Sequence, residues 1–163
     1  MTRTPLVLLL VLGVLGAFDT LWYHERTAKL PSQQSAWLEL RLHAARDLVY
    51  VIIFGTLGWY IWTGMLAWFI AFLLVTEICI TLWDFIEEDR TRKLPAGERI
   101  THALMGIVYG SFVAYLFPEI IKWEHQSSGL TRTNQSIVSW VFSVIALGLL
   151  ISGTRDLWAS VRN

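Results

Sequence analysis

Two Glu-x-x-x-His pairs are the residues of this sequence best suited to chemistry: Glu39 with His43, and Glu98 with His102. Residues four apart in a helix share one face, so the two side chains of each pair would project together. A carboxylate beside an imidazole suits iron, manganese or zinc. A single pair of this kind is usually a feature of a helix surface. Two of them in one short chain predict a shared site.

Other ionisable residues fall at comparable places. Asp84 and Glu88 are again four residues apart, and Asp19 and His24 end the first apolar segment. These groups lie at one end of four successive helices, where they can meet at one depth. We predict eight metal ligands: Asp19, His24, Glu39, His43, Asp84, Glu88, Glu98 and His102.

Three deeper residues, Glu77, Tyr50 and Tyr109, are candidates for a proton relay or a substrate pocket. Each tyrosine follows the histidine of its pair by seven residues, about 10 Å of helix at about 1.5 Å per residue. Helix packing with a protonated, hydrogen-bonded Glu77 and satisfied tyrosine hydroxyls explains the same residues equally well. The sequence assigns no residue a catalytic role.

The predicted cluster has a physical cost that a metal would offset. Ionisable side chains inside a membrane are unfavourable, and packed carboxylates repel one another unless protons or cations neutralise them. Carboxylates from facing helices with two Glu–His pairs are the ligands of di-iron and di-manganese bundles, although their Glu and His are three residues apart and here they are four. The single cysteine, Cys79, lies in an apolar run, which argues against copper(I) and iron–sulfur sites.

The helices that carry these residues belong to a membrane protein. The chain has 163 residues, 55% of them apolar, with nine Trp, which is too apolar for a soluble domain of this length. Its net charge is zero, so it has no basic surface for nucleic acid. The bilayer is therefore its first expected partner.

Five stretches approach the roughly 20 apolar residues that a transmembrane helix needs. We predict an all-α membrane protein of one domain, residues 1–163, in which residues 5–58 and 65–117 each form a helical hairpin, the two hairpins form a four-helix bundle, and residues 134–153 form a fifth helix. Pro118 is expected to close the fourth helix, and the uncharged segment WYIWTG to form a tight interfacial hairpin. The five expected spans are Pro5 to about Tyr23, Trp37 to about Gly58, Met65 to Asp84, Ile100 to Phe117, and Ile137 to about Ser152.

Basic residues predict the orientation. The positive-inside rule places the first and third connections and the C-terminus in the cytoplasm, with the N-terminus outside. A cleaved signal peptide over residues 1–18 is the alternative, but no small-x-small cleavage site precedes Asp19. The cytoplasmic side holds Arg26, Lys29, Arg41, Arg46, Arg90, Arg92, Lys93, Arg99, Arg155 and Arg162, and the other side holds Arg3, Lys122 and Arg132.

An internal repeat connects the two pairs. HERTAKLP, from His24, aligns with EDRTRKLP, from Glu88, and ELRLHAARDLVY aligns with ERITHALMGIVY when the second loop is shortened by five residues. Two hairpins of equal orientation are related by an axis along the membrane normal, and sites that they share lie between them. Because His24 aligns with Glu88, the two halves differ and two bound metals would be inequivalent.

The strings TLWDFIEEDRTRKLPAGERITH and ELRLHAARD resemble a small bacterial integral-membrane family, whose segments also occur fused to epimerase-like short-chain dehydrogenase relatives. The resemblance covers most of the first four predicted helices. It implies a location in the bacterial cytoplasmic membrane and carries no activity.

The leading functional hypothesis is a membrane-embedded di-iron protein, an oxidoreductase acting on a lipid or quinone-like substrate. Zinc or manganese could use the same ligands, and zinc would make the protein a hydrolase. Haem held by His43 and His102, and a cation path through Glu77, are further alternatives. The cation path would need a homo-oligomer, because five helices are few for transport. The last alternative is an accessory subunit that docks on a larger membrane assembly through the Trp-rich fifth helix.

Overall fold

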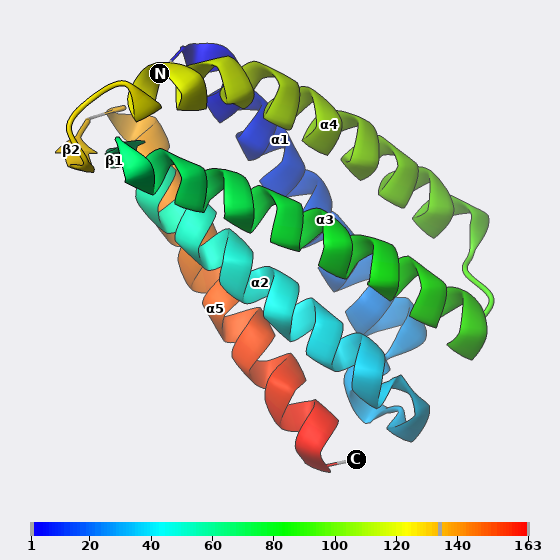
Figure 1. Ribbon diagram of the computed structural model, residues 1–163. Helices are drawn as coiled ribbons and strands as arrows, with labels where there is room; N and C mark the ends of the chain where they lie inside the picture. The colour runs from blue at the N-terminus through cyan, green and yellow to red at the C-terminus, as the bar shows by residue number, and fades with distance from the viewer. Residues whose placement is uncertain (1, 134, 163) are drawn as a thin grey trace.

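The computed structural model describes residues 2–133 and 135–162. Within these residues the chain forms five α-helices that run back and forth along one direction (Figure 1). Residue 134, where the expected segment 134–153 begins, lies outside the described residues. The helices are α1 (Arg3–Phe18), α2 (Trp37–Leu57), α3 (Met65–Thr91), α4 (Ala96–Glu124) and α5 (Ile137–Arg162).

Four helical segments are long and apolar enough to cross a membrane: Arg3–Ala28, Met65–Thr91, Ala96–Glu124 and Ile137–Arg162. The chain is therefore all-α, and the length and apolar character of these helices fit a membrane protein, as the composition predicts. Helix α2 is not among these four segments. Its first three turns carry the charged residues Glu39, Arg41, Arg46 and Asp47, which lower its mean hydropathy.

Helix α4 does not end at Pro118, so the predicted boundary was wrong. The helix continues through this proline to Glu124. Proline removes one backbone donor from a helix, and packing on either side can hold the helix together. Leu116 and Ile120, which flank Pro118, are both fully buried, whereas Pro118 itself lies on the exposed face.

The WYIWTG segment is not a tight hairpin either. Its residues Tyr60–Thr63 form strand β1, which pairs antiparallel with strand β2 (Gly129–Arg132) from the connection between α4 and α5. The pairing brings Tyr60 opposite Arg132 and satisfies backbone groups that an isolated turn would leave open. Gly64 then turns the chain into α3 with φ of +60°, and a Cβ there would collide with Ser128.

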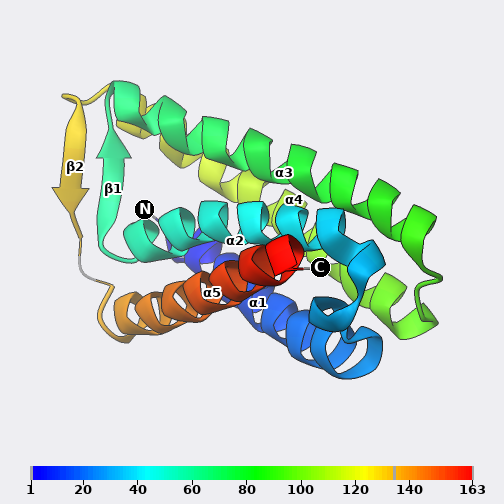
Figure 2. The ribbon, with the colours of Figure 1, turned by 90° about the horizontal axis from the view of Figure 1, so that it is seen from below.

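The helices pack in a layered order. Helix α1 lies against α4, α4 against α3, and α2 lies between α3 and α5 (Figure 2). Aromatic and aliphatic side chains fill the middle, as in the edge-to-face contact of Phe54 with Phe142 at 5.1 Å between ring centroids. One face of helix α5 therefore packs against α2, and its outer face carries the exposed residues Trp140 and Trp158.

The two ends of the bundle differ in character. The β1–β2 ribbon and the N-terminus lie at one end, and the C-terminus lies at the other (Figure 1). At this second end α1 continues as a π-helix, η1 (Asp19–Ala28), followed by the 3₁₀ turns η2 (Leu30–Ser32) and η3 (Gln34–Ala36). The α3–α4 connection, residues 92–95, lies at the same end. The ionisable residues singled out by the sequence are near these connections.

Candidate metal centre

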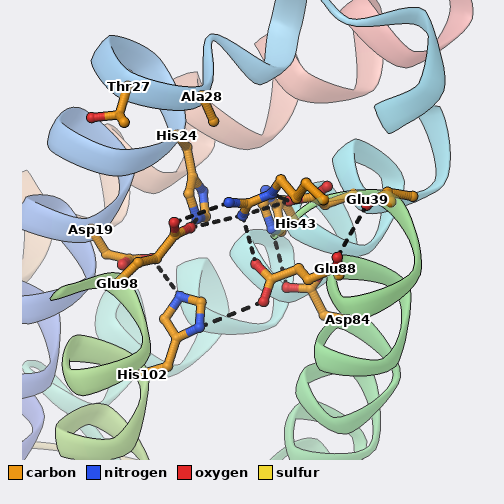
Figure 3. A network of polar contacts seen from close by, with 12 residues as sticks. Asp19, His24, Thr27, Ala28, Glu39, His43, Asp84, Glu88, Glu98 and His102 are labelled. Atoms are coloured by element: carbon orange, nitrogen blue, oxygen red, sulfur yellow. Dashed lines mark hydrogen bonds and ion pairs between the residues drawn. The ribbon is translucent and has the colours of Figure 1, made fainter. Parts of the chain in front are cut away.

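All eight predicted ligands meet at the end of the bundle that carries η1 and the α3–α4 connection. They come from η1, α2, α3 and α4, two from each, and point toward one another (Figure 3). None of their side chains is more than a tenth exposed. The eight are Asp19, His24, Glu39, His43, Asp84, Glu88, Glu98 and His102.

The π-helix explains how Asp19 and His24 reach the cluster together. Residues five apart in an α-helix lie on different faces, but i→i+5 hydrogen bonding widens the turn and brings them nearly into line. His24 Nε2 accordingly lies 3.2 Å from Asp19 Oδ2. Lys29, in the left-handed region at φ of 52°, ends this segment. Gly97 leaves room beside it, because a Cβ there would collide with the hydroxyl of Tyr23.

On α2, His43 faces Asp84 of α3. Its Nε2 lies 3.1 Å from Asp84 Oδ2, and Arg46 Nη1 donates a hydrogen bond to the same oxygen at 3.0 Å. The His43 ring also stacks on the ring of His24, with centroids 4.5 Å apart and planes 6° apart. These contacts fix the His43 imidazole beside two other cluster residues.

On α4, His102 lies between Asp19 and Glu88. Its Nε2 donates to Asp19 Oδ2 at 3.2 Å, and its Nδ1 lies 3.5 Å from Glu88 Oε2. The ring of Phe85 stacks on the imidazole at 5.2 Å between centroids. The orientation of His102 is therefore set by η1 and α3 together.

Arg92, which the sequence marks only as a topology signal, is a central member of the cluster. Its guanidinium donates to Glu39 Oε1 from Nε and Nη2, to both oxygens of Glu98, and to Glu88 Oε1, at 2.7–3.1 Å. Burial alone would lower the pKa of Arg92, but hydrogen bonds to Glu98 and the charge and hydrogen bonds of Glu39 outweigh it and raise the pKa above its ordinary value. The guanidinium is therefore a permanent positive charge among three carboxylates.

The charges of the described cluster residues balance only if all three imidazoles are protonated. Five carboxylates face two guanidinium groups, Arg46 and Arg92, with three imidazoles besides. With neutral imidazoles the cluster holds an excess of about three negative charges, which is costly in a buried site. Three protons or additional cations must compensate.

Several buried polar atoms of the cluster make no hydrogen bond with any described residue. They include His24 Nε2, His43 Nε2 and Glu88 Oε2, although each lies within 3.6 Å of a polar atom of another cluster residue. At these distances the atoms are close but not aligned for hydrogen bonds, so each could still accept a further ligand. Glu39 Oε2, Asp19 Oδ1 and Asp84 Oδ1 are unpartnered in the same way.

Two sets of these residues could each hold an ion. In both sets one ligand atom from each residue lies within 4.8 Å of every other. The first set is Glu39, His43 and Glu88, and the second is His24, Glu88, Glu98 and His102. Glu88 belongs to both and is thus placed to bridge two ions.

The deeper residues form a separate polar group. Tyr50 and Thr81 both donate to Glu77 Oε1, at 2.9 and 2.8 Å, and Glu77 Oε2 is buried without a hydrogen bond to any residue that the structure describes. Tyr109 donates to the backbone oxygen of Leu74 at 2.6 Å. Both the relay and the packing interpretation stay open.

No family model, curated protein or solved structure matches this chain. The resemblance to a bacterial membrane family stays a prediction, and the geometry of the cluster is the basis of the functional proposal.

Proposed function

We propose that the protein is an integral-membrane di-metal protein whose two ions lie in the cluster at the cytoplasmic end of the bundle. The first set of ligands, with Asp84 beside it, would hold one ion. The second set, with Asp19 beside it, would hold the other, and Glu88 would bridge them.

The observation that carries this proposal is the pair of overlapping, fully buried ligand sets that share Glu88. Acidic clusters occur often without a metal, so the unpartnered atoms matter as a second observation. His24 Nε2, His43 Nε2 and Glu88 Oε2 are buried and aimed into the cluster without hydrogen bonds to described residues. An ion would satisfy these atoms, and two divalent ions would neutralise the excess negative charge.

The ligand types favour iron, with manganese and zinc as the competing ions. Five carboxylates and three imidazoles without sulfur make an oxygen-rich set, similar in kind to the di-iron and di-manganese carboxylate bundles. Bound iron would supply redox chemistry to a hydrophobic substrate reached from the bilayer. The protein's own residues would hold the ions, exclude water and keep the imidazoles oriented.

Two alternatives fit the contacts less well. A haem between His43 and His102 would need the space of Glu88, which lies close to both imidazoles. A cation path from the cluster to Glu77 would pass Arg46, whose positive charge lies on α2 between His43 and Tyr50. Both arguments leave the di-metal proposal as the one supported best.

The orientation proposed from the sequence still has support. Arg46 and Arg92 are engaged by cluster carboxylates and no longer count as free loop charges. Eight basic residues then remain on the cluster side against three on the other, and by the positive-inside rule this excess supports an orientation with the cluster at the cytoplasmic end of the bundle.

Elemental analysis tests the proposal. Protein purified in detergent after expression in iron-supplemented medium should contain about two metal atoms per chain. Glu88→Gln should lose both, and Glu87→Gln, one residue away and in neither ligand set, should retain both. A folded wild-type chain that holds no stoichiometric iron, manganese or zinc would rule the proposal out.

A further inference from the structure

The two ligand sets differ in how many of their atoms are already engaged. In the first set, Glu39 Oε2, His43 Nε2 and Glu88 Oε2 are all buried and make no hydrogen bond with described residues. Arg92 holds Glu39 and Glu88 through their other oxygens, Oε1 in each case. An ion can therefore enter this position while Arg92 stays in place.

The second set is closed by the same arginine. Both oxygens of Glu98 accept hydrogen bonds from Arg92, Oε1 at 2.7 Å and Oε2 at 3.0 Å. His102 Nε2 is engaged as well, by Asp19. His24 Nε2 is a free imidazole nitrogen in this set. An ion cannot take Glu98 as a ligand at full strength until Arg92 releases it.

We infer that the two metal positions fill in order, the Glu39/His43/Glu88 position first, and that Arg92 holds the His24/Glu88/Glu98/His102 position closed. The inference rests on the proposed function. An ion bound to Glu39 and Glu88 withdraws charge from the oxygens that hold the guanidinium and repels it as a like charge. The first ion therefore loosens Arg92, and release of Glu98 opens the second position.

The predicted repeat indicates why only one position is closed. Aligning HERTAKLP with EDRTRKLP puts Ala28 opposite Arg92, so the first hairpin has no guanidinium at the equivalent place. Arg92 also follows the last residue of α3 and precedes the helix-free residues 93–95. Its side chain can thus withdraw without unwinding a helix.

Titration with Co²⁺ alone, in detergent and without other metals, measures the two affinities separately by calorimetry and by optical absorption. Wild-type protein should bind about two ions in two steps, the second at least about tenfold weaker, since hydrogen bonds between charged groups must be broken first. Arg92→Gln should tighten the second step by about ten- to a hundredfold and the first step by less, because Glu39 and Glu88 each keep one oxygen free of Arg92 in the wild type. The exposed Arg99→Gln, seven residues on, is the control and should behave as wild type.

Two further variants assign the steps. His43→Ala should remove the tight step, and His102→Ala should remove the weak one. Arg92→Lys keeps the charge but cannot bind both oxygens of Glu98 at once, so its second step should lie between wild type and Arg92→Gln. This variant keeps the test decisive if Arg92→Gln does not fold.

Thermal unfolding separates this gating role from a purely structural one. Arg92→Gln should lower Tm of the metal-free protein and leave Tm at saturating Co²⁺ near the wild-type value. A purely structural arginine would lower both equally. Equal, simultaneous binding of two ions in wild type and in Arg92→Gln would overturn the inference and leave the di-metal proposal standing. Absence of any Co²⁺ binding in wild type would overturn both.

Discussion

Glu88→Gln is the substitution that most sharply separates a metal centre from a network of ion pairs. The change keeps the shape of the side chain, and Glu88 Oε1 can be replaced by an amide oxygen that still accepts from Arg92. It removes the one carboxylate shared by both ligand sets. Because Glu88 Oε2 is buried without a hydrogen bond to described residues, little is lost when that oxygen becomes an amide nitrogen. The metal-free variant should therefore be as stable as wild type, or more stable.

The magnitude follows from linkage. An ion that binds only the folded chain stabilises it by about 2.7 kcal/mol at a free concentration of about 100 times Kd. For a chain of this length about 1 kcal/mol corresponds to roughly 2–4 °C in Tm, so one ion should raise Tm by roughly 5–11 °C. Loss of a ligand common to both ions should remove this rise, since even outer-sphere partners of metal ligands are worth about 10- to 100-fold in affinity.

The assay is thermal unfolding in detergent, followed by tryptophan fluorescence, with and without added Fe²⁺ under anaerobic conditions. Glu87→Gln is the control, because Glu87 belongs to neither ligand set and pairs with the exposed Arg90 at 3.9 Å. The reasoning is refuted if Glu88→Gln shows the same metal-dependent rise in Tm as wild type. It is refuted equally if the metal-free variant unfolds far below wild type, because Glu88 would then act as a structural ion-pair partner.

Two other substitutions test the packing around the cluster. Gly97→Ala should lower the free energy of unfolding by about 1–3 kcal/mol, because the added methyl group overpacks against the Tyr23 hydroxyl. Tyr23→Phe in the same chain should recover most of this loss. An unchanged Tm in the single variant would show that residue 97 and the Tyr23 hydroxyl are not in tight contact. Tyr50→Phe removes one of two hydrogen bonds to Glu77 and should lower the free energy of unfolding, measured by chemical denaturation, by about 1–3 kcal/mol. Tyr115→Phe, on the exposed face of α4, is the control and should have no measurable effect. Equal effects of the two substitutions would show that the hydrogen bond to Glu77 does not stabilise the fold.

Residues four apart were the part of the site that sequence periodicity could predict. Glu39 with His43, and Glu98 with His102, lie on α-helices, where that spacing sets the side chains on one face. Asp19 and His24 are five apart and share a face only because η1 is a π-helix, for which the sequence carries no recognised signal. Their place near the cluster was predicted from their position at the end of the first apolar segment and not from their spacing.

Arg92 shows a different limit. A basic residue at the end of a membrane helix is ordinarily a topology signal, and nothing in its neighbours indicates that it turns inward. It does so because three carboxylates from α2, α3 and α4 meet beside the short α3–α4 connection. Strand β1 was missed for a related reason, since its partner β2 lies more than 60 residues away along the chain.

X-ray absorption of the iron-loaded protein tests the central claim most directly. Two ions bridged by Glu88 predict a first shell of oxygen and nitrogen only, without sulfur, and a second iron at about 3.5–4 Å. A first shell with sulfur, or isolated iron without a metal neighbour at that distance, would contradict a carboxylate-bridged pair in this cluster.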